Sequence, residues 1–395
     1  MLALELHHVP GQLRLEAYLL DWLTLIARWA HIVVGIAWIG ASFYFIWLDN
    51  HLEPARDPAF AGELYAIHGG GFYRAQKYRL APAELPQTLH WFKWEAYWTW
   101  LTGFALLVLV YYLNAGLYLI DPQVMKLSPG AAIGIGLASL VAGLVVYEGL
   151  CRSPLTETGL AIALLVIFAL VAWALTQVFS GRGAFIHFGA ILGTIMAGNV
   201  AHVIIPGQRE LVRAKQQGRE PDPKYGLMGK QRSVHNTYFT LPVIFTMISG
   251  HHAMTFGAQW NWLVLIAMAL AGALVRLWFV ARHKGRAPAW TLVAGLALVA
   301  AVAVALAPGK SGGAPVALAE AKQVIDQRCV SCHAEKPAFP GLAEAPKGIK
   351  LDTAERIEAQ RMTIRQQTVL TRAMPPGNLT KLTEEERTLL DRWTR

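Results

Sequence analysis

Residues 290–333 read WTLVAGLALVAAVAVALA (290–307), PGKSGGAP (308–315) and VALAEAKQVIDQRCVSCH (316–333). The first part is an uncharged apolar run whose length as a helix is close to the thickness of the hydrocarbon core of a bilayer. The second part is rich in Pro and Gly, which is typical of a flexible linker. The third part is polar and ends in a cysteine motif. We therefore predict a membrane domain over residues 1–307, a linker over 308–315 and a small soluble domain over 316–395.

Seven similar apolar runs precede this one, at residues 20–48, 96–118, 131–149, 159–179, 184–205, 237–256 and 261–281. Over the whole chain of 395 residues, 54% are hydrophobic and only 15% are charged, which excludes an ordinary soluble protein. Inside lipid, a helix satisfies all of its own backbone hydrogen bonds. The sequence therefore predicts an all-α fold, in which a polytopic transmembrane helical bundle of about eight spans precedes a small soluble all-α domain. In that domain we predict helices over 316–327, 352–372 and 383–395.

Lys and Arg residues are distributed unevenly between the two ends of the predicted spans. If the N-terminus is outside, the cytoplasmic loops hold most of them, Arg209 and Arg232 included. Only Arg14, Lys126 and Arg182 then lie outside. The positive-inside rule favours this orientation, so we predict a multi-pass protein of the bacterial inner (plasma) membrane whose N-terminus and C-terminal domain are periplasmic. This topology also explains the net charge of +9, so we expect membrane lipid and no nucleic acid as a partner.

Cys329-Val330-Ser331-Cys332-His333 has the C-x-x-C-H spacing of a c-type haem attachment site. Two thiols one helical turn apart form thioethers to the porphyrin, and the adjacent imidazole ligates the iron. A redox or zinc-binding C-x-x-C is the alternative, but zinc would need further Cys or His ligands, and no others follow Leu306. We therefore predict one covalent haem c, held by Cys329, Cys332 and His333, in a class I-like cytochrome c domain.

The second axial ligand of this haem is predicted to be Met374. It lies in Ala373-Met374-Pro375-Pro376-Gly377, where the prolines would stiffen the loop that presents the thioether. The rival, Met362, lies inside a predicted helix and is better explained by packing. A His/Met ligand pair raises the reduction potential, so this haem would be a good acceptor for electrons from the membrane domain.

Several histidines lie inside the predicted spans, where an ionisable residue is costly and indicates function. An oxidation site on the cytoplasmic side would lie a bilayer away from the outer haem, so a buried electron relay would be needed. Imidazoles from two facing helices are a natural way to hold a b-type haem, and His31 with His251 is the pair to test first. Alternatively, each histidine only hydrogen-bonds a neighbouring carbonyl or hydroxyl. The sequence leaves both alternatives open.

The segment LHWFKWEAYWTW (89–100) leads into the second predicted span. An interfacial aromatic belt explains its tryptophans but not His90, Lys93 and Glu95 at one helical entrance. A base, a cation and an acid side by side could bind and deprotonate an anionic heterocycle. Equally, Lys93 could only extend towards the interface and Glu95 only cap the helix.

Five groups of segments share the pattern of a known family: WAHIVVGIAWIG (29–40), HGGGFY (68–73), LHWFKWEAYWTW (89–100), NV (199–200) with IIPGQ (204–208), and SVHNTY (233–238) running to SGH (249–251). In these segments the chain resembles the membrane-bound urate oxidase (urate hydroxylase) family of bacteria, which joins an eight-span domain to a C-terminal cytochrome c. The resemblance spans nearly the whole chain. The sequence departs from the family pattern at Gly250 and His252.

The resemblance implies that urate is oxidised to 5-hydroxyisourate at the cytoplasmic side, with water as the oxygen source and without hydrogen peroxide. The electrons would leave through the c-type haem to a soluble cytochrome c or a terminal oxidase. The candidate site residues are His90 and His235 as acid/base groups, Glu95 as the group that orients or tunes them, and Lys93, Gln208 and Asn236 as substrate contacts.

Two other functions share some of these features. A haem-carrying electron-transfer subunit that accepts electrons from quinol or a partner dehydrogenase shares every feature of the predicted haem domain. His31 with Trp38-Ile39-Gly40 and His51 also resembles the membrane protoporphyrinogen oxidases. Those proteins, however, are much shorter and lack a cytochrome tail.

Overall fold

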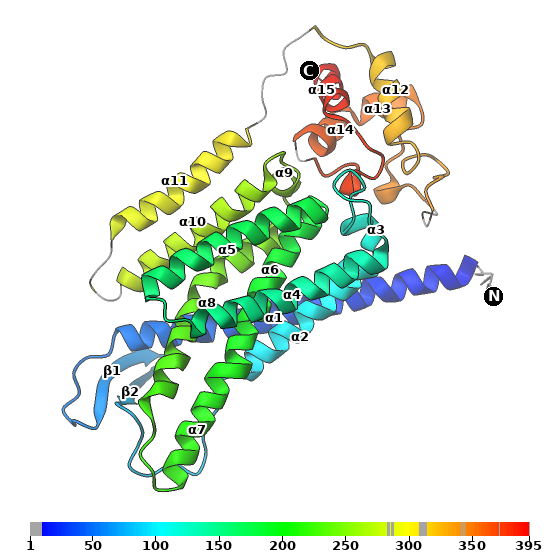
Figure 1. The fold of residues 1–395 in the computed structure, drawn as a ribbon. Helices are drawn as coiled ribbons and strands as arrows, with labels where there is room; N and C mark the ends of the chain where they lie inside the picture. The colour runs from blue at the N-terminus through cyan, green and yellow to red at the C-terminus, as the bar shows by residue number, and fades with distance from the viewer. Residues whose placement is uncertain are drawn as a thin grey trace.

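A computed structural model of the protein describes residues 10–282, 285, 288–307, 314–340, 342, 344–370 and 372–394. Most of the predicted linker, at 308–313, therefore lies outside the described residues. The chain is mostly helical (Figure 1). Its first part contains α1 (Pro10–Asn50), α2 (Trp94–Leu106), η1 (Leu107–Tyr112), α3 (Ala115–Tyr118), α4 (Pro129–Arg152), α5 (Glu157–Val178), α6 (Gly181–Gly198), η2 (Asn199–Ile204), α7 (Ile205–Gln216), α8 (Pro223–Ser249), α9 (Ala253–Phe256), α10 (Asn261–Arg282) and α11 (Ala289–Ala305).

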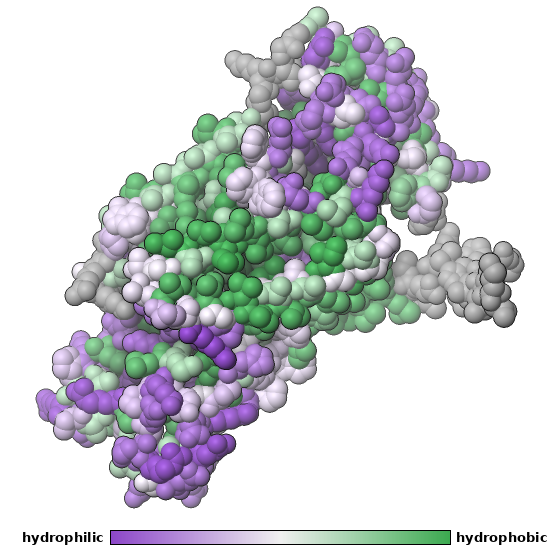
Figure 2. Space-filling model, in the orientation of Figure 1, coloured by the Kyte–Doolittle hydropathy of each residue, from purple (hydrophilic) through white to green (hydrophobic). Residues whose placement is uncertain are grey.

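Helices cover all eight predicted apolar runs, and five of them are long and apolar enough to cross a membrane: Tyr18–Asn50, Pro129–Arg152, Glu157–Val178, Gly181–Gln216 and Asn261–Arg282. The second run is interrupted, because α2 passes into the π-helical η1 and the helix breaks at Asn114. The sixth run is interrupted as well, because α8 ends at Ser249 and a turn separates it from α9. Figure 2 shows a wide apolar belt between two polar ends, as expected for a helical bundle with lipid around it.

The bundle is built around α6. In its apolar stretch 67% of the residues are buried by the rest of the protein, whereas in α1 none are, so α6 is the central helix and α1 a peripheral one. Helix α6 packs on α4, α5 and α8, and its face carries Phe185, Phe188 and Ile195, which are almost fully buried. Glycines on α6 and α4 allow this close packing: a Cβ on Gly143 would lie 2.5 Å from the Cγ2 atom of Ile191.

A β-hairpin is added to the mostly helical architecture, and the predicted all-α fold did not include it. Strand β1 (Phe60–His68) pairs antiparallel with β2 (Gly71–Tyr78), with His68 opposite Gly71. The turn residues Gly69 and Gly70 both have positive φ, at 57° and 81°, which is the backbone that a two-residue hairpin turn requires. The sequence analysis treated this segment only as a loop. We call the end of the bundle that carries the hairpin the hairpin end.

Residues 316–394, which we call the C-terminal domain, form a separate hydrophobic cluster around Ile325, Ile357 and Leu390. The domain contains α12 (Leu318–Arg328), η3 (Pro346–Gly348), α13 (Ala354–Ala359), α14 (Arg361–Ile364), η4 (Arg365–Leu370), η5 (Pro376–Asn378) and α15 (Glu384–Thr394). The first and third predicted helices match α12 and α15. The second is broken at Gln360 and continues as the π-helical η4. The domain sits at the end of the bundle opposite the hairpin, against α3, and we call this the docked end (Figure 1).

Candidate functional site

Six polar side chains from three separate segments meet inside the bundle, in the half nearer the hairpin end. We call them the inner polar cluster: Tyr147 and Glu148 of α4, Asn199 at the start of η2, and Arg232, His235 and Asn236 of α8. Four of the six are buried, with Tyr147, Asn199 and Arg232 at most 2% exposed. Polar groups inside an apolar bundle must find partners within the protein, so their positions are closely determined.

The Tyr147 hydroxyl is the centre of the cluster. It accepts a hydrogen bond from Asn199 Nδ2 at 2.9 Å and lies 2.8 Å from His235 Nδ1. A neutral His235 ring with its proton on Nε2 lets the hydroxyl donate to Nδ1, so that both contacts are satisfied at once. The second hydrogen of Asn199 Nδ2 goes to Asn236 Oδ1 at 2.8 Å, and Asn236 Nδ2 donates to the Met196 carbonyl at 3.0 Å. A proton can therefore pass between Tyr147 and His235 without any side chain moving.

Arg232 supplies the charge of this cluster. Its Nη2 atom lies 2.9 Å from Glu148 Oε2, its guanidinium lies 5.1 Å from the centre of the Tyr147 ring, and Nη1 donates to Asn199 Oδ1 at 3.5 Å. The sequence analysis counted Arg232 among the charges of a cytoplasmic loop, and that is wrong because α8 begins at Pro223 and buries its side chain. Glu148 balances the charge of Arg232, and the remaining guanidinium N–H groups beside amides, an imidazole and a phenol are donors of the kind that bind a planar anion.

The π-helical segment η2 positions Asn199 for this network. It widens the helix between α6 and α7, and such segments often occur at functional sites. On another side of η2, Val200 packs with Ala96 of α2 and with Ile205. The entrance of α2 and the inner polar cluster are therefore both in contact with η2.

The predicted residues at the α2 entrance lie at the surface rather than in the cluster. His90 is exposed in the loop before α2, Lys93 precedes the first residue of the helix with its Nζ 5.2 Å from the Trp94 ring, and Glu95 is in the first turn. Gln208 is exposed on α7, and its side chain makes no hydrogen bond with a described residue. Of the predicted catalytic and substrate residues, the structure thus places His235 and Asn236 in the inner polar cluster, whereas His90, Lys93 and Glu95 lie outside it at the entrance of α2.

The predicted haem b ligands have separate neighbours. His31 Nδ1 lies 3.0 Å from the Thr102 hydroxyl, and the ring packs against Gly103. His251 is exposed in the turn after α8, near the docked end. No contact between the two rings occurs among the described residues. His187, by contrast, is fully buried and bonded on both ring nitrogens, to the Gly183 carbonyl at 2.8 Å and the Tyr112 hydroxyl at 3.1 Å.

The sequence analysis assigned no role in the site to Tyr147, Glu148 or Asn199, which lie within apolar runs, although Asn199 belongs to a segment that carries the family resemblance. It also missed Arg276, a buried cation of α10 whose guanidinium lies 3.5 Å from the centre of the Phe43 ring. The signal was present, because an ionisable or amide side chain within a predicted span is costly. The sequence analysis applied this argument only to the histidines.

In the C-terminal domain, the C-x-x-C-H motif forms the turn that ends α12. The His333 and Cys332 amides both donate to the Cys329 carbonyl, and neither cysteine is in a disulfide. His333 Nδ1 contacts the Ile349 carbonyl at 2.9 Å, which orients the ring and leaves Nε2 free for a metal. Arg328, just before the motif, makes two bonds of 3.1 Å from Nε to the carboxylate of Glu386 in α15. These residues fit a covalent haem, with thiols and an imidazole in the required order.

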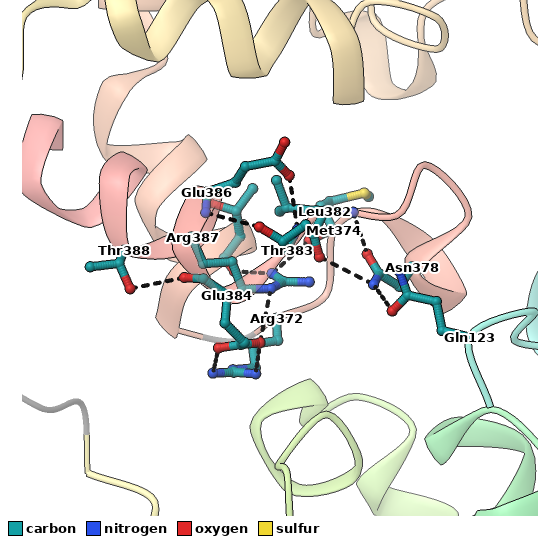
Figure 3. Close-up of polar contacts among 11 residues, drawn as sticks. Gln123, Arg372, Met374, Asn378, Leu382, Thr383, Glu384, Glu386, Arg387 and Thr388 are labelled. Atoms are coloured by element: carbon teal, nitrogen blue, oxygen red, sulfur yellow. Dashed lines mark hydrogen bonds and ion pairs between the residues drawn. The ribbon is translucent and has the colours of Figure 1, made fainter.

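The Met374 loop is held by its backbone. Its amide donates to the Gln367 carbonyl at 2.9 Å, and its carbonyl accepts from Arg387 Nη1 at 3.2 Å. Figure 3 shows Arg387 between this loop and Glu384, with the Met374 sulfur pointing away from both. Burial, together with the neighbouring Arg372, lowers the pKa of Arg387 to about 10, so that it stays cationic at neutral pH. Met362, the rival ligand, is exposed.

A comparison with known families identifies the bundle. The model of the family described as "Urate oxidase N-terminal" matches residues 17–307. No curated protein and no solved structure matches the chain. The matched region contains all eight predicted spans and ends where PGKSGGAP begins, so that CVSCH lies outside it. The match indicates an oxidoreductase and a urate-related oxidation. Because it covers well over half of the 395 residues, the chain belongs to the Urate oxidase N-terminal family.

Proposed function

We propose that the protein is a membrane-bound urate oxidase that hydroxylates urate to 5-hydroxyisourate and passes the electrons to a c-type haem in its C-terminal domain. The observation that carries this proposal is the combination of the family match over the bundle with a C-x-x-C-H turn in a domain that packs on the same bundle. The proposed topology follows the basic residues: the hairpin end is cytoplasmic, and the N-terminus and C-terminal domain are periplasmic.

The proposed reaction is balanced as urate plus water giving 5-hydroxyisourate, two protons and two electrons. Urate is a planar anion near neutral pH, and it would bind the N–H groups of Arg232 that the contact between Nη2 and Glu148 leaves available. Lys93 and Gln208 are substrate contacts on the path from the cytoplasm, since both have polar ends near the surface. The Tyr147–His235 pair and His90 accept the two protons, with Glu95 tuning His90. Asn236 holds η2 against α8, because both ends of its amide are bonded within the protein.

Cys329, Cys332, His333 and Met374 would hold the haem, which supplies a one-electron acceptor of raised potential. Two turnovers of that acceptor are needed for each urate, so an external partner must reoxidise it, and a soluble cytochrome c or a terminal oxidase fits this role. Because the electrons leave by this route and not to dioxygen, no hydrogen peroxide is formed.

The test uses the purified full-length protein with its haem attached. Urate alone should reduce the haem, and His90→Ala or His235→Ala should abolish this reduction while dithionite still reduces the haem fully. A His90→Ala/His235→Ala variant with full urate activity would end the assignment of these two residues. If urate does not reduce the haem of the wild-type protein, the proposed function is wrong.

The second candidate, an electron-transfer subunit fed by quinol, is favoured by one observation. A cavity of about 430 Å³ lies between α2 and α6 and is lined mainly by apolar and aromatic side chains, Trp94, Tyr97, Trp100 and Leu144 among them. An isoprenoid quinol would fit such a lining. Reduction of the haem by a quinol analogue, but not by urate, would select this function.

A further inference from the structure

The turn after Met374 makes a close contact between the C-terminal domain and the bundle. Gly377, in η5, has a positive φ of 55°, and a Cβ atom there would lie 2.9 Å from the Leu117 carbonyl oxygen of α3. The next residue, Asn378, donates from Nδ2 to Gln123 Oε1 at 3.0 Å, as Figure 3 shows. We call Pro375–Asn378 the docking turn. Glycine is required at its tip because the backbone of α3 occupies the place of a side chain.

A second contact lies beside the docking turn. Arg372 packs on the turn after α9, where a Cβ on Gly257 would be 3.2 Å from the Arg372 Cβ. Its guanidinium is fixed by two bonds of 2.7 Å to Glu384. Between the two contacts is a cavity of about 210 Å³, lined from the bundle by Arg182 and Asn261 and from the C-terminal domain by Arg372 and Arg387. The two parts therefore meet over a surface built from several elements on each side.

We propose that the docking turn is the point at which electrons from the bundle enter the C-terminal domain, so that the domain is reduced on its Met374 side while docked on α3. The turn begins directly after Met374, whose carbonyl is held by Arg387 at 3.2 Å, so the predicted ligand loop is itself the docked surface. The C-x-x-C-H turn is on a different segment, after α12, and among the described residues its backbone makes no hydrogen bond to the bundle. The electron-entry part of the proposal rests on the proposed function, whereas docking itself does not.

Two glycine-to-asparagine variants test the contact between the docking turn and α3. Asparagine tolerates positive φ better than other side chains, so Gly377→Asn keeps the turn but pushes a side chain against Leu117. The matched control is Gly348→Asn in the same domain, where φ is 68° and no atom lies within 4 Å of the added Cβ. The Gly348→Asn variant measures the loss of stability caused only by replacing a glycine of positive φ.

Two measurements are made on the full-length, haem-loaded protein. The first is cross-linking of Lys126 to Lys381, two exposed lysines that are three residues from Gln123 and from Asn378, with a lysine-reactive reagent and detection of the joined peptides by mass spectrometry. The second is the rate of haem reduction by urate, compared with reduction by ascorbate. The linker alone keeps the domain at an effective concentration on the order of millimolar, so undocking slows the reaction and does not stop it.

We expect Gly377→Asn to lower the cross-linking yield several-fold and the urate-driven rate about tenfold or more, with the ascorbate rate unchanged and the Gly348→Asn protein like wild type. Wild-type levels of both quantities in Gly377→Asn would overturn the proposal. If urate reduces the wild-type protein but Lys126 and Lys381 cannot be cross-linked, the proposed docking on α3 is wrong and the proposed function is unaffected. A wild-type protein that cross-links but is not reduced by urate would refute the proposed function, and electron entry with it.

Discussion

Replacing Tyr147 with Phe removes one hydroxyl from the inner polar cluster and keeps the ring. Two hydrogen bonds are lost, at 2.9 Å from Asn199 and at 2.8 Å to His235. Asn199 is 1% exposed, so its freed N–H finds no water, whereas the partly exposed His235 can be hydrated. The unpaired Asn199 N–H costs about 1–3 kcal/mol and the lost hydrogen bond to His235 about 1 kcal/mol, so the variant should lose about 2–4 kcal/mol of stability.

The effect on activity should be larger than this loss of stability explains. If the Tyr147–His235 pair accepts a proton from urate, removal of the hydroxyl should slow urate-driven haem reduction about a hundredfold or more, the usual contribution of an acid/base group. The assay is stopped-flow reduction of the c-type haem, with thermal unfolding of the same detergent-solubilised sample measured beside it.

Tyr238→Phe is the matched control, because Tyr238 is on the same helix and its hydroxyl makes no hydrogen bond with a described residue. It should retain the activity and stability of the wild type. A Tyr147→Phe protein that unfolds earlier but reduces its haem at the wild-type rate would refute the proton role and leave a structural one. Unchanged stability would refute the hydrogen-bond network itself.

Two further predictions concern the C-terminal domain. Met374→Leu should remove the charge-transfer absorption of methionine-ligated ferric haem and lower the reduction potential, with Met362→Leu as the unaffected control; the reverse pattern would make Met362 the ligand. Glu386→Gln should destabilise the domain by about 1–2 kcal/mol at neutral pH, between the values for exposed and buried ion pairs. Burial is the largest single influence and raises the pKa of Glu386, but the hydrogen bonds from Arg328 and from the Thr383 amide, together with the positive charge of Arg328, outweigh it and lower the pKa below the usual range. The stabilisation is therefore present above the pKa of the unfolded state and lost as the pH falls through the folded pKa, so the difference between wild type and Glu386→Gln should shrink in acid. A pH-independent difference in thermal unfolding would contradict this account.

Local sequence patterns were sufficient to predict the haem-attachment motif and the apolar helices. The C-x-x-C-H motif and the apolar runs could be interpreted directly because covalent attachment needs a fixed spacing and a bilayer needs a fixed length. The hairpin was missed although Gly69-Gly70 is a strong turn signal, because the segment was judged as a loop between spans. The inner polar cluster could not be found in this way. Its bonds join residues 88, 52 and 37 positions apart, and only the packing of α4, η2 and α8 brings them together.

The distance from the inner polar cluster to the docked end bears on how electrons would cross the bundle. Tyr147 and the docked end are separated by 18 residues of α4, or about 27 Å at the rise of an α-helix. If the proposed function is correct, a single electron step over that distance would be slow, so we predict a redox group between them, a b-type haem. His187 is unsuited to hold it, since both of its ring nitrogens are already bonded. In His31, Nδ1 lies 3.0 Å from the Thr102 hydroxyl. A pyridine haemochrome spectrum of the purified protein should show b-type as well as c-type haem. The b-type signal should vanish in His31→Ala and His251→Ala but persist in His252→Ala, which alters the neighbouring exposed histidine of the same turn. A spectrum with c-type haem alone, from protein that urate still reduces, would mean that the electrons cross the bundle by a route without haem.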